Sequence, residues 1–380
     1  MNKIIVATDS YKGSLSAAEA CRIIAEEATA RFPRAEILQM PIADGGEGLI
    51  EALLSVLPGK IVEIETLDPL GRPIRANYAL LEDGSALIEM ASAAGLLLLT
   101  ENERDPDLTS TYGVGLMILD AHQRGANPIY IGLGGSATID GGVGAASALG
   151  LCFQNGVGEV ARVARSGADL ADLDSVEHSG FDRLAMAEEL IFLVDVNSPL
   201  CGPNGAAVIY GPQKGADQEQ IWRLNKGLAK LAALVEKDTN RYLNEMEGIG
   251  AAGGFALPFV AYANATMFSG INFVLDKLGF NQELVGTNLV ITGEGRTDVQ
   301  SALGKAISEV ARRADMQGVR VAVISGLLGK GAENLFALGV NDLVQAAPPD
   351  VELKDALANA EEYLRTAVRN FLTKVENEES

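Results

Sequence analysis

Six short segments of the chain hold carboxylate, hydroxyl or cationic side chains, the groups that bind phosphates and metal ions, and all but the fourth of them, 195–199, also contain glycine. Glycine lets backbone N–H groups come close to a phosphate, and a helix that begins at such a loop adds partial positive charge. The segments are residues 9–14, 43–48, 132–140, 195–199, 211–216 and 292–298. Together they indicate a site that handles a small anionic ligand.

The first segment follows the apolar run 4–8 and holds Asp9, Ser10 and Lys12. Open α/β sheets bind their ligands where parallel strands end, and this loop lies at such an end if the run is a strand. We therefore predict that Lys12 and Asp9 act in catalysis and that Ser10 binds the substrate. The competing interpretation is a capped surface turn with a solvated lysine, and the local pattern alone does not separate the two.

The last segment, residues 292–298, also follows an apolar run and holds Glu294, Arg296 and Asp298, with Lys305 shortly after it. Two carboxylates and an arginine this close together can hold a metal ion and a phosphate, or they can pair with each other at the surface. The position after a predicted parallel strand favours function. We predict Glu294 and Asp298 as metal ligands and Arg296 as a phosphate contact. The same phosphate role is predicted for Lys305.

The central segment, residues 132–140, begins after the apolar run 129–131 and leads into a helix of small residues. Tight packing explains the small residues of the helix, but it does not explain the hydroxyls and the carboxylate at its start. Asp140 is predicted to bind a metal ion. Four residues of the loop are predicted to contact phosphate groups: Gly134, Gly135, Ser136 and Thr138.

Three further segments supply candidates. Asp195 and Asn197 follow an apolar run and suit Mg²⁺ or substrate hydroxyls, although Asp and Asn before proline are equally common as turn formers. We predict Asp195 as the general base and Asn197 as a substrate contact, because Asn197 offers a neutral partner for a substrate hydroxyl. Lys214 lies among glycines and is predicted to contact phosphate. Asp44 and Glu47, in a glycine-rich loop, are predicted to bind the substrate.

The chemistry of the site is narrowed by motifs that the sequence lacks. His122 lies in a helical run and His178 in a polar loop, and no G-x-S-x-G elbow occurs, which disfavours covalent hydrolysis. Nor is there a G-x-x-x-x-G-K-[ST] loop, because Ala306 follows Gly304 and Lys305. Phosphoryl transfer remains, because it asks mainly for positioning, Mg²⁺ and cations.

Three other classes of protein share part of this pattern. A galactokinase-like kinase has a Gly/Ser-rich phosphate loop similar to residues 132–138, but its other motifs are missing. A nucleotide-dependent oxidoreductase fits the alternating strands and helices, yet Ser147 stands where its dinucleotide loop needs a third glycine or alanine. A non-catalytic sugar-acid sensor would need no metal-binding carboxylates.

Composition narrows the class of protein further. The chain has 380 residues, 48% of them hydrophobic, which is enough apolar material for two domains. Lys and Arg number 30 against 51 Asp and Glu, a formal net charge of -21 that argues against nucleic acid and anionic membranes as partners. Three widely spaced cysteines are typical of reduced thiols. No signal peptide or membrane-spanning run is apparent, so the cytoplasm is the expected location.

Strands and helices alternate at both ends of the chain, from residue 4 to residue 57 and again from residue 288 onward. Between them, residues 61–66 alternate apolar and charged side chains, and turns at 68–73 and 83–84 are typical of hairpins. This pattern predicts an α/β fold with a doubly wound parallel sheet. The predicted domains are a discontinuous one, residues 1–64 and 287–380, and an inserted mixed-sheet α/β domain, residues 65–286.

Taken in order, these segments resemble the bacterial glycerate kinase family. The resemblance spans nearly the whole chain and rests on residues 9–14, 43–48, 88–91, 132–140, 195–202, 211–216, 250–254 and 293–305. The sequence departs from the usual pattern of that family at Tyr11, where Phe is usual, and at Ile139, where Asn is common. It departs again at Thr287 and Asn288, where Ala-Asp often precedes the strand.

The resemblance implies an ATP- and Mg²⁺-dependent kinase of D-glycerate, with 2-phosphoglycerate as the usual product, in glycerate, glyoxylate or sugar-acid breakdown. It also implies a flavodoxin-like domain formed by both termini, with a second domain inserted between them. The partners are then two small molecules, ATP and D-glycerate, and neither nucleic acid nor membrane. The sequence leaves the oligomeric state open, with a homodimer among the alternatives.

Overall fold

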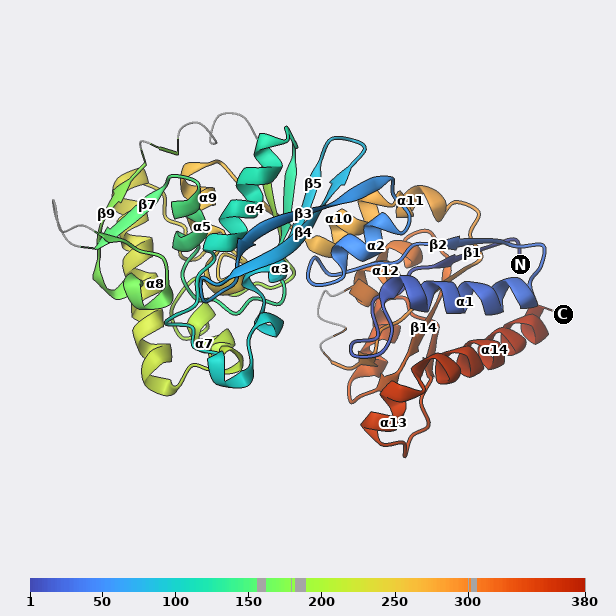
Figure 1. Ribbon diagram of the computed structural model, residues 1–380. Helices are drawn as coiled ribbons and strands as arrows, with labels where there is room; N and C mark the ends of the chain where they lie inside the picture. The colour runs from blue at the N-terminus through green and yellow to red at the C-terminus, as the bar shows by residue number, and fades with distance from the viewer. Residues whose placement is uncertain (156–161, 179, 182–188, 300, 302–305, 380) are drawn as a thin grey trace. The chain divides into compact units, whose positions relative to one another are not determined.

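The computed structural model describes residues 1–155, 162–178, 180–181, 189–299, 301 and 306–379 of the chain (Figure 1). These residues fall into two compact units. Unit 1 comprises Met1–Asp44, Glu51–Leu57 and Gly270–Ser380, and unit 2 comprises Gly45–Ile50 and Pro58–Ser269. Both ends of the chain therefore contribute to unit 1.

Unit 1 is built on a five-stranded parallel sheet in the order β16-β14-β12-β1-β2. Its strands are β1 (Lys3–Val6), β2 (Glu36–Gln39), β12 (Leu289–Thr292), β14 (Arg320–Ser325) and β16 (Asp342–Gln345). Numbered along the chain, this is the 2-1-3-4-5 order of flavodoxin-like sheets. The direction of winding reverses between β1 and β12, so the loops after these two strands border the point at which such sheets bind ligands.

Helices cover both faces of this sheet. They are α1 (Ala17–Arg31), α10 (Gly270–Lys277), α11 (Phe280–Glu283), α12 (Ala306–Asp315), α13 (Leu353–Ala358) and α14 (Ala360–Glu379). Helices α1 and α14 lie side by side (Figure 1) and pack on the face that presents Ile4 and Ile291. Alternate strand residues such as Ile5 and Val323 are equally buried, and α12 packs on their side of the sheet.

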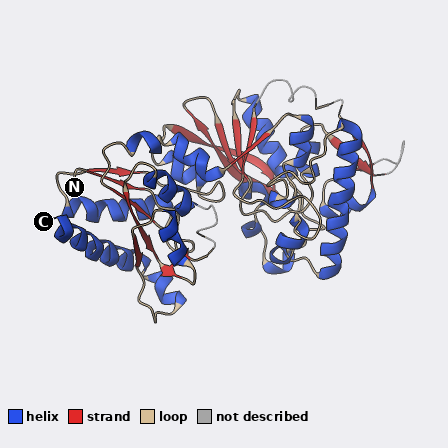
Figure 2. Ribbon diagram, turned by 180° about the vertical axis from the view of Figure 1, so that it is seen from behind, coloured by secondary structure: helices blue, strands red, loops and turns tan. Residues whose placement is uncertain are grey.

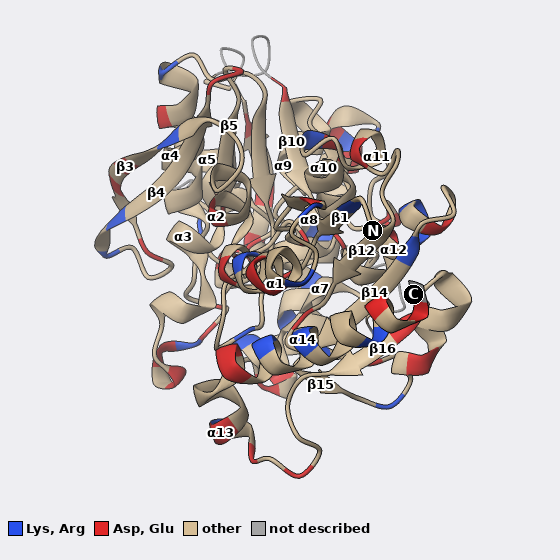
Figure 3. Cartoon of the chain, turned by 90° about the vertical axis from the view of Figure 1, so that its right-hand side faces the viewer, with Lys and Arg blue, Asp and Glu red and all other residues tan. Residues whose placement is uncertain are grey.

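The two terminal helices are fixed locally by caps and ion pairs. Ser16 and Glu19 form a capping box, with the Ser16 hydroxyl accepting from the backbone N–H of Glu19. Charges of both signs are mixed along α14 (Figure 3), where Arg365 pairs with Glu26 of α1 at 2.7 Å. None of the described helices is long and apolar enough to cross a membrane.

Unit 2 is built on a six-stranded mixed sheet in the order β11-β10-β6-β5-β4-β3, drawn among the red strands of Figure 2. Its strands are β3 (Gly59–Leu67), β4 (Pro73–Leu81), β5 (Ala86–Glu89), β6 (Ile129–Gly132), β10 (Leu190–Leu193) and β11 (Thr266–Phe268). Strands β3, β4 and β5 pair antiparallel as predicted for hairpins, and β5, β6, β10 and β11 pair in parallel. A smaller antiparallel sheet has the order β8-β7-β9: β8 (Arg162–Val163), β7 (Cys152–Asn155) and β9 (Leu173–Glu177).

The helices of unit 2 enclose one hydrophobic core. They are α3 (Ala91–Ala94), α4 (Tyr112–Gln123), α5 (Val143–Ala148), α7 (Ala206–Tyr210), α8 (Gln218–Thr239) and α9 (Leu257–Tyr262), and α2 (Leu49–Leu54) crosses the boundary between the units. Phe192, Phe255 and Phe259 meet in this core with ring centroids 5.4 to 5.6 Å apart. The core fixes the strands β6 and β10, whose following loops hold the predicted site residues.

The α/β fold class, with one parallel and one mixed sheet, is confirmed. The limits of the units differ from the predicted domain limits, because β3 lies wholly in unit 2 and α10 lies in unit 1. The predicted domains are residues 1–64 together with 287–380, and residues 65–286. That they fold independently stays a prediction.

Gly142 offers a test of how tightly the turn before α5 is held. Its φ is 74°, and an added Cβ would lie 2.2 Å from the carbonyl oxygen of Phe255. Gly125, with φ of 77°, has nothing within 4 Å of that position. We expect Gly125→Ala to cost about 1 kcal/mol through φ alone, and Gly142→Ala to cost about 1–3 kcal/mol more because of overpacking. Urea denaturation of the two variants checks this, and equal costs would contradict it.

Candidate active site

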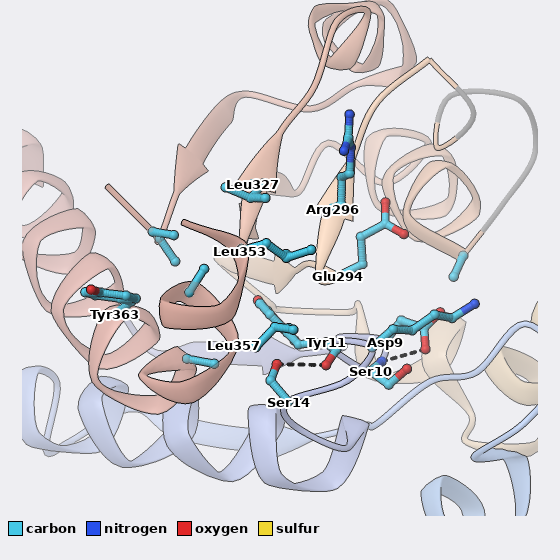
Figure 4. A pocket seen from close by; sticks show the side chains of 18 of the residues that line it. Asp9, Ser10, Tyr11, Ser14, Glu294, Arg296, Leu327, Leu353, Leu357 and Tyr363 are labelled. Atoms are coloured by element: carbon cyan, nitrogen blue, oxygen red, sulfur yellow. Dashed lines mark hydrogen bonds between the residues drawn. The ribbon is translucent and has the colours of Figure 1, made fainter. Parts of the chain in front are cut away.

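A pocket of about 380 Å³ lies at the carboxyl edge of the parallel sheet of unit 1. The loops after four neighbouring strands line it: Asp9 follows β1, Glu294 follows β12, Leu327 follows β14 and Ala347 follows β16. Figure 4 shows Asp9, Ser10, Glu294 and Arg296 on one side of this pocket. Because parallel strands end at one edge, residues far apart in sequence meet here.

Backbone hydrogen bonds join these loops to one another. The N–H of Asp9 donates to the carbonyl of Gly293 at 3.0 Å, and the N–H of Gly326 donates to that of Glu294 at 3.1 Å. The N–H of Ala347 in turn donates to the carbonyl of Gly326 at 3.0 Å. The lining of the pocket is therefore fixed by main-chain bonds that continue the sheet pairing beyond the strands.

Asp9 has an unusual electrostatic environment. Burial and the nearby charge of Asp44 raise the pKa of Asp9 to about 7, and Glu294 acts in the same direction. The hydrogen bond that Asp9 accepts from the N–H of Ser10, at 2.6 Å, and the charge of Lys12 oppose this rise in pKa. A carboxylate with a pKa near neutrality can exchange protons at working pH, and the catalytic role of Asp9 stays a prediction.

Glu294 is held in place by hydroxyl groups. Its Oε1 accepts from Ser301 at 2.5 Å and from Thr297 at 3.1 Å, and the Thr297 hydroxyl lies 2.6 Å from that of Ser325. Arg296 and Asp298, by contrast, lie nearer the surface. Arg296 is 66% exposed, and its Nε lies 3.6 Å from the carboxylate of Asp298. The pairing of Arg296 with Asp298 at the surface, which was the alternative to a phosphate contact, is therefore present. Lys305 lies outside the described residues.

The glycines of the loop after β6 are explained in part by close packing within unit 2. An added Cβ on Gly134 would lie 2.4 Å from the Cα of Gly46, and one on Gly135 would lie 2.6 Å from the Glu47 carboxylate. The loop 45–47 therefore needs glycine opposite it. Packing and anion binding both call for these glycines, so their presence alone does not identify a phosphate site.

Lys214 is turned into unit 2 and is only 2% exposed. Its Nζ donates to the hydroxyl of Ser136 at 2.7 Å and to the carbonyl of Thr138 at 2.8 Å. Burial lowers the pKa of Lys214 to about 7, against the attraction of Asp140. These two hydrogen bonds hold the loop 136–138 in place. The phosphate contact of Lys214 stays a prediction.

Asp140 is fully buried and fastens the start of α5. Its Oδ2 accepts from the N–H and the hydroxyl of Thr111, at 2.8 and 2.7 Å, and from the N–H of Gly144 at 3.3 Å. Its Oδ1 accepts from the N–H of Gly142 at 3.1 Å. Four hydrogen bonds to one carboxylate give Asp140 a positioning role, and metal binding by it stays a prediction.

Asp195 lies two residues after β10, as predicted, and its Oδ1 accepts from the hydroxyl of Ser269 at 2.9 Å. Asp195 is partly buried, whereas Asn197 is exposed. Both side chains are therefore placed where parallel strands of the mixed sheet end. Their roles as base and substrate contact stay predictions.

Ten of the predicted residues gather in two groups, one in each unit. Six of them line the pocket of unit 1: Asp9, Ser10, Lys12, Asp44, Glu294 and Arg296. Ser136, Thr138, Asp140 and Lys214 form the group in unit 2. Within the described part of the chain, no three His, Cys, Asp or Glu side chains gather closely enough to hold a metal ion by themselves.

Sequence reasoning missed two features of the site. Glu89 ends β5 and accepts from the N–H of Ile50 at 2.9 Å, and burial raises the pKa of Glu89. Leucines from α13 and from the short strand β15 (Leu327–Leu328) line the unit 1 pocket. Glu89 could have been found from the sequence, because it is a carboxylate at the end of an apolar run. The leucines could not, because leucine is an ordinary core residue.

A flavodoxin-like sheet with a pocket at its carboxyl edge, in a chain that also holds a second α/β unit, is typical of enzymes that act on small molecules. The model of the Glycerate kinase family matches residues 4–376. Glycerate kinase of Bacillus subtilis strain 168 is 37% identical over 374 residues, which cover 98% of this chain and 97% of that protein. The chain belongs to the glycerate kinase family and is an enzyme of that family, so the resemblance is confirmed.

Other relatives agree over the same length. Glycerate 2-kinase of Escherichia coli K12 is 37% identical over 372 residues, which cover 97% of each chain. The crystal structure of a Salmonella typhimurium LT2 protein, described as a candidate glycerate kinase 2, is similar with a TM-score of 0.87 at 38% identity. It covers 100% of this chain and 99% of that one. The fold is therefore shared over the full length.

The carboxyl of Asp9 should titrate near pH 7 in the ligand-free protein, as followed by carbon-13 NMR of aspartate carboxyls. Asp44→Asn removes a negative charge and should lower the pKa of Asp9, whereas Lys12→Met removes a positive charge and should raise it. Asp9→Asn identifies the signal by abolishing it. A titration near pH 4 in the unchanged protein, or shifts of the same sign in both variants, would contradict the described environment.

Lys214 should make stability depend on pH in the alkaline range. Between pH 7 and the unfolded pKa of 10.5, the unfolded chain binds a proton that the folded protein does not, so the free energy of unfolding rises with pH. Relative to Lys214→Met, the wild type should gain up to about 1.4 kcal/mol per pH unit in this window. Urea denaturation at pH 7, 8 and 9 measures this difference, and a constant difference would mean that Lys214 stays charged.

Proposed function

We propose that this protein transfers the γ-phosphoryl group of ATP to the 2-hydroxyl of D-glycerate, giving 2-phosphoglycerate and ADP, in the breakdown of glycerate or of acids that yield it. The observation that supports this best is membership of the glycerate kinase family over nearly the whole chain. The relative from Escherichia coli is named a glycerate 2-kinase, which favours the 2-hydroxyl as acceptor. The carboxylates and cations placed at the strand ends suit this chemistry.

In the proposed step, the oxygen of the glycerate 2-hydroxyl forms a bond to the γ-phosphorus while the bond from that phosphorus to the β–γ bridging oxygen breaks. ADP leaves with that oxygen, and the hydroxyl proton passes to a carboxylate. We assign this proton to Asp195, because its carboxylate follows a parallel strand of the mixed sheet and is oriented by a hydrogen bond from the Ser269 hydroxyl at 2.9 Å. Lys12 and Arg296 supply positive charge for the phosphates.

Mg²⁺ fits the carboxylates of the unit 1 pocket. This ion prefers oxygen ligands and is usually held by one or two carboxylates together with phosphates and water, so a complete protein cage is not needed. Burial raises the pKa of Asp9, the charges of Asp44 and Glu294 raise it further, and a cation bound among these carboxylates would relieve their repulsion. When bound, Mg²⁺ would neutralise charge on the transferred phosphoryl group. Asp298 is a further proposed ligand, and Asp140 is less suited because its oxygens already accept four hydrogen bonds.

Asp195→Asn keeps the size of the side chain but removes its ability to accept the proton. We expect turnover to fall about 10² to 10⁴-fold, while ATP affinity stays nearly unchanged. Asp174→Asn, at an exposed position of β9, serves as the control and should behave like the wild type. A coupled ADP-release assay with D-glycerate measures turnover.

The site of phosphorylation is read from the product by phosphorus NMR. A phosphate on C2 is coupled to one proton and gives a doublet, whereas a phosphate on C3 is coupled to two protons and gives a triplet. A triplet would overturn the 2-hydroxyl assignment. Loss of ATP affinity in Asp195→Asn with turnover retained at saturation would instead make Asp195 a binding residue.

A further inference from the structure

The pocket of unit 1 has two chemically different halves. One half is charged and holds Asp9, Lys12, Glu294 and Arg296. The other half is apolar, and Figure 4 shows Leu327, Leu353 and Leu357 on the side opposite Glu294 and Arg296. The proposed chemistry uses only the charged half, so the apolar half needs its own explanation.

The apolar half is formed mainly by one face of α13 and the start of α14. Leu353, Ala356, Leu357, Ala360 and Tyr363 all line the pocket, at the spacing of one helical face. Leu353 is 64% exposed and Leu357 is 37% exposed, although both lie beside a cavity that other apolar groups border. Exposed leucines that line a cavity are typical of a binding surface for an apolar group.

This apolar surface continues directly into the loop after β1. An added Cβ on Gly13 would lie only 3.6 Å from Cδ2 of Leu357, so α13 reaches the loop that holds Asp9 and Lys12. A ligand that fills the pocket would therefore contact leucine side chains at one end and charged side chains at the other. The volume of the pocket, about 380 Å³, lies in the range of small-molecule sites, which is roughly 300–1,000 Å³.

The two reactants of the proposed function differ in how they fit such a pocket. D-Glycerate has three carbons, two hydroxyls and a carboxylate, and it offers no apolar face for several leucines and alanines. The nucleotide has a flat aromatic base at one end, whose faces can pack against apolar side chains, and a chain of phosphates at the other. Its two ends match the two halves of the pocket in order.

We propose that the apolar half of this pocket holds the adenine ring of the nucleotide, with its phosphates directed to Lys12 and Arg296. This inference rests on the proposed function. The position supports it, because the loops after β1 and β12 border the switch point of a flavodoxin-like sheet. The adenine assignment makes Ser10, which was predicted to contact the substrate, a contact of the nucleotide. Glycerate would then bind to other loops.

The test places a carboxylate in the apolar half by Leu357→Glu, with Leu353→Glu as a second variant on the same face. Val285→Glu is the matched control, because Val285 is 71% exposed, lies in unit 1 and does not line the pocket. Losing the burial of one leucine against adenine should raise the KM for ATP about tenfold in both pocket variants. The KM for D-glycerate should change less than twofold, and Val285→Glu should match the wild type.

A binding measurement separates the base from the phosphates. A fluorescent ADP analogue is displaced by adenosine or by inorganic tripolyphosphate, and Leu357→Glu should weaken displacement by adenosine while leaving tripolyphosphate unchanged. An unchanged KM for ATP in both pocket variants, or a rise in the KM for glycerate alone, would overturn the adenine assignment. If the wild type neither binds the ADP analogue nor phosphorylates glycerate, the proposed function itself fails, which is a separate result.

Discussion

The parallel pairing of β1 with β12 is the constraint on which the pocket of unit 1 depends. It joins the beginning of the chain to its last quarter, with Ile4 opposite Leu289 and Val6 opposite Ile291. The register is fixed at its start by Asn288, whose side-chain oxygen accepts from the N–H groups of Asn2 at 2.7 Å and Lys3 at 3.1 Å. A slip of one residue would move every apolar side chain of β1 to the other face of the sheet.

The same pairing explains one departure from the usual family pattern. Asn288 stands where Asp is frequent, and either side chain offers an oxygen that can accept both N–H groups. The bond from Asp9 to Gly293 then extends the pairing past the strands, so Asp9 and Glu294 come to border one pocket. Burial is the largest cause of the raised pKa of Asp9, and the register adds to it because it makes Glu294 a neighbour of Asp9.

The sequence predicted much of this arrangement because its signals are local. Apolar runs followed by polar loops with carboxylates located the ends of β1, β12 and β10. The direction of Lys214 was not predictable, because a lysine among glycines has the same pattern whether it faces solvent or a buried hydroxyl. The partners of the buried Lys214 ammonium lie in the loop 136–138, which is remote from it in sequence.

The apolar half of the pocket escaped prediction for a related reason. Leu353 and Leu357 repeat at helical spacing, and such a repeat is usually a core face, so nothing local marks it as a binding surface. Only the tertiary structure shows that these side chains remain exposed beside a cavity instead of packing under another element. Charged residues can therefore be assigned to a site from sequence, because they are costly to bury without a reason, whereas apolar residues need the fold to show which of them lack a partner.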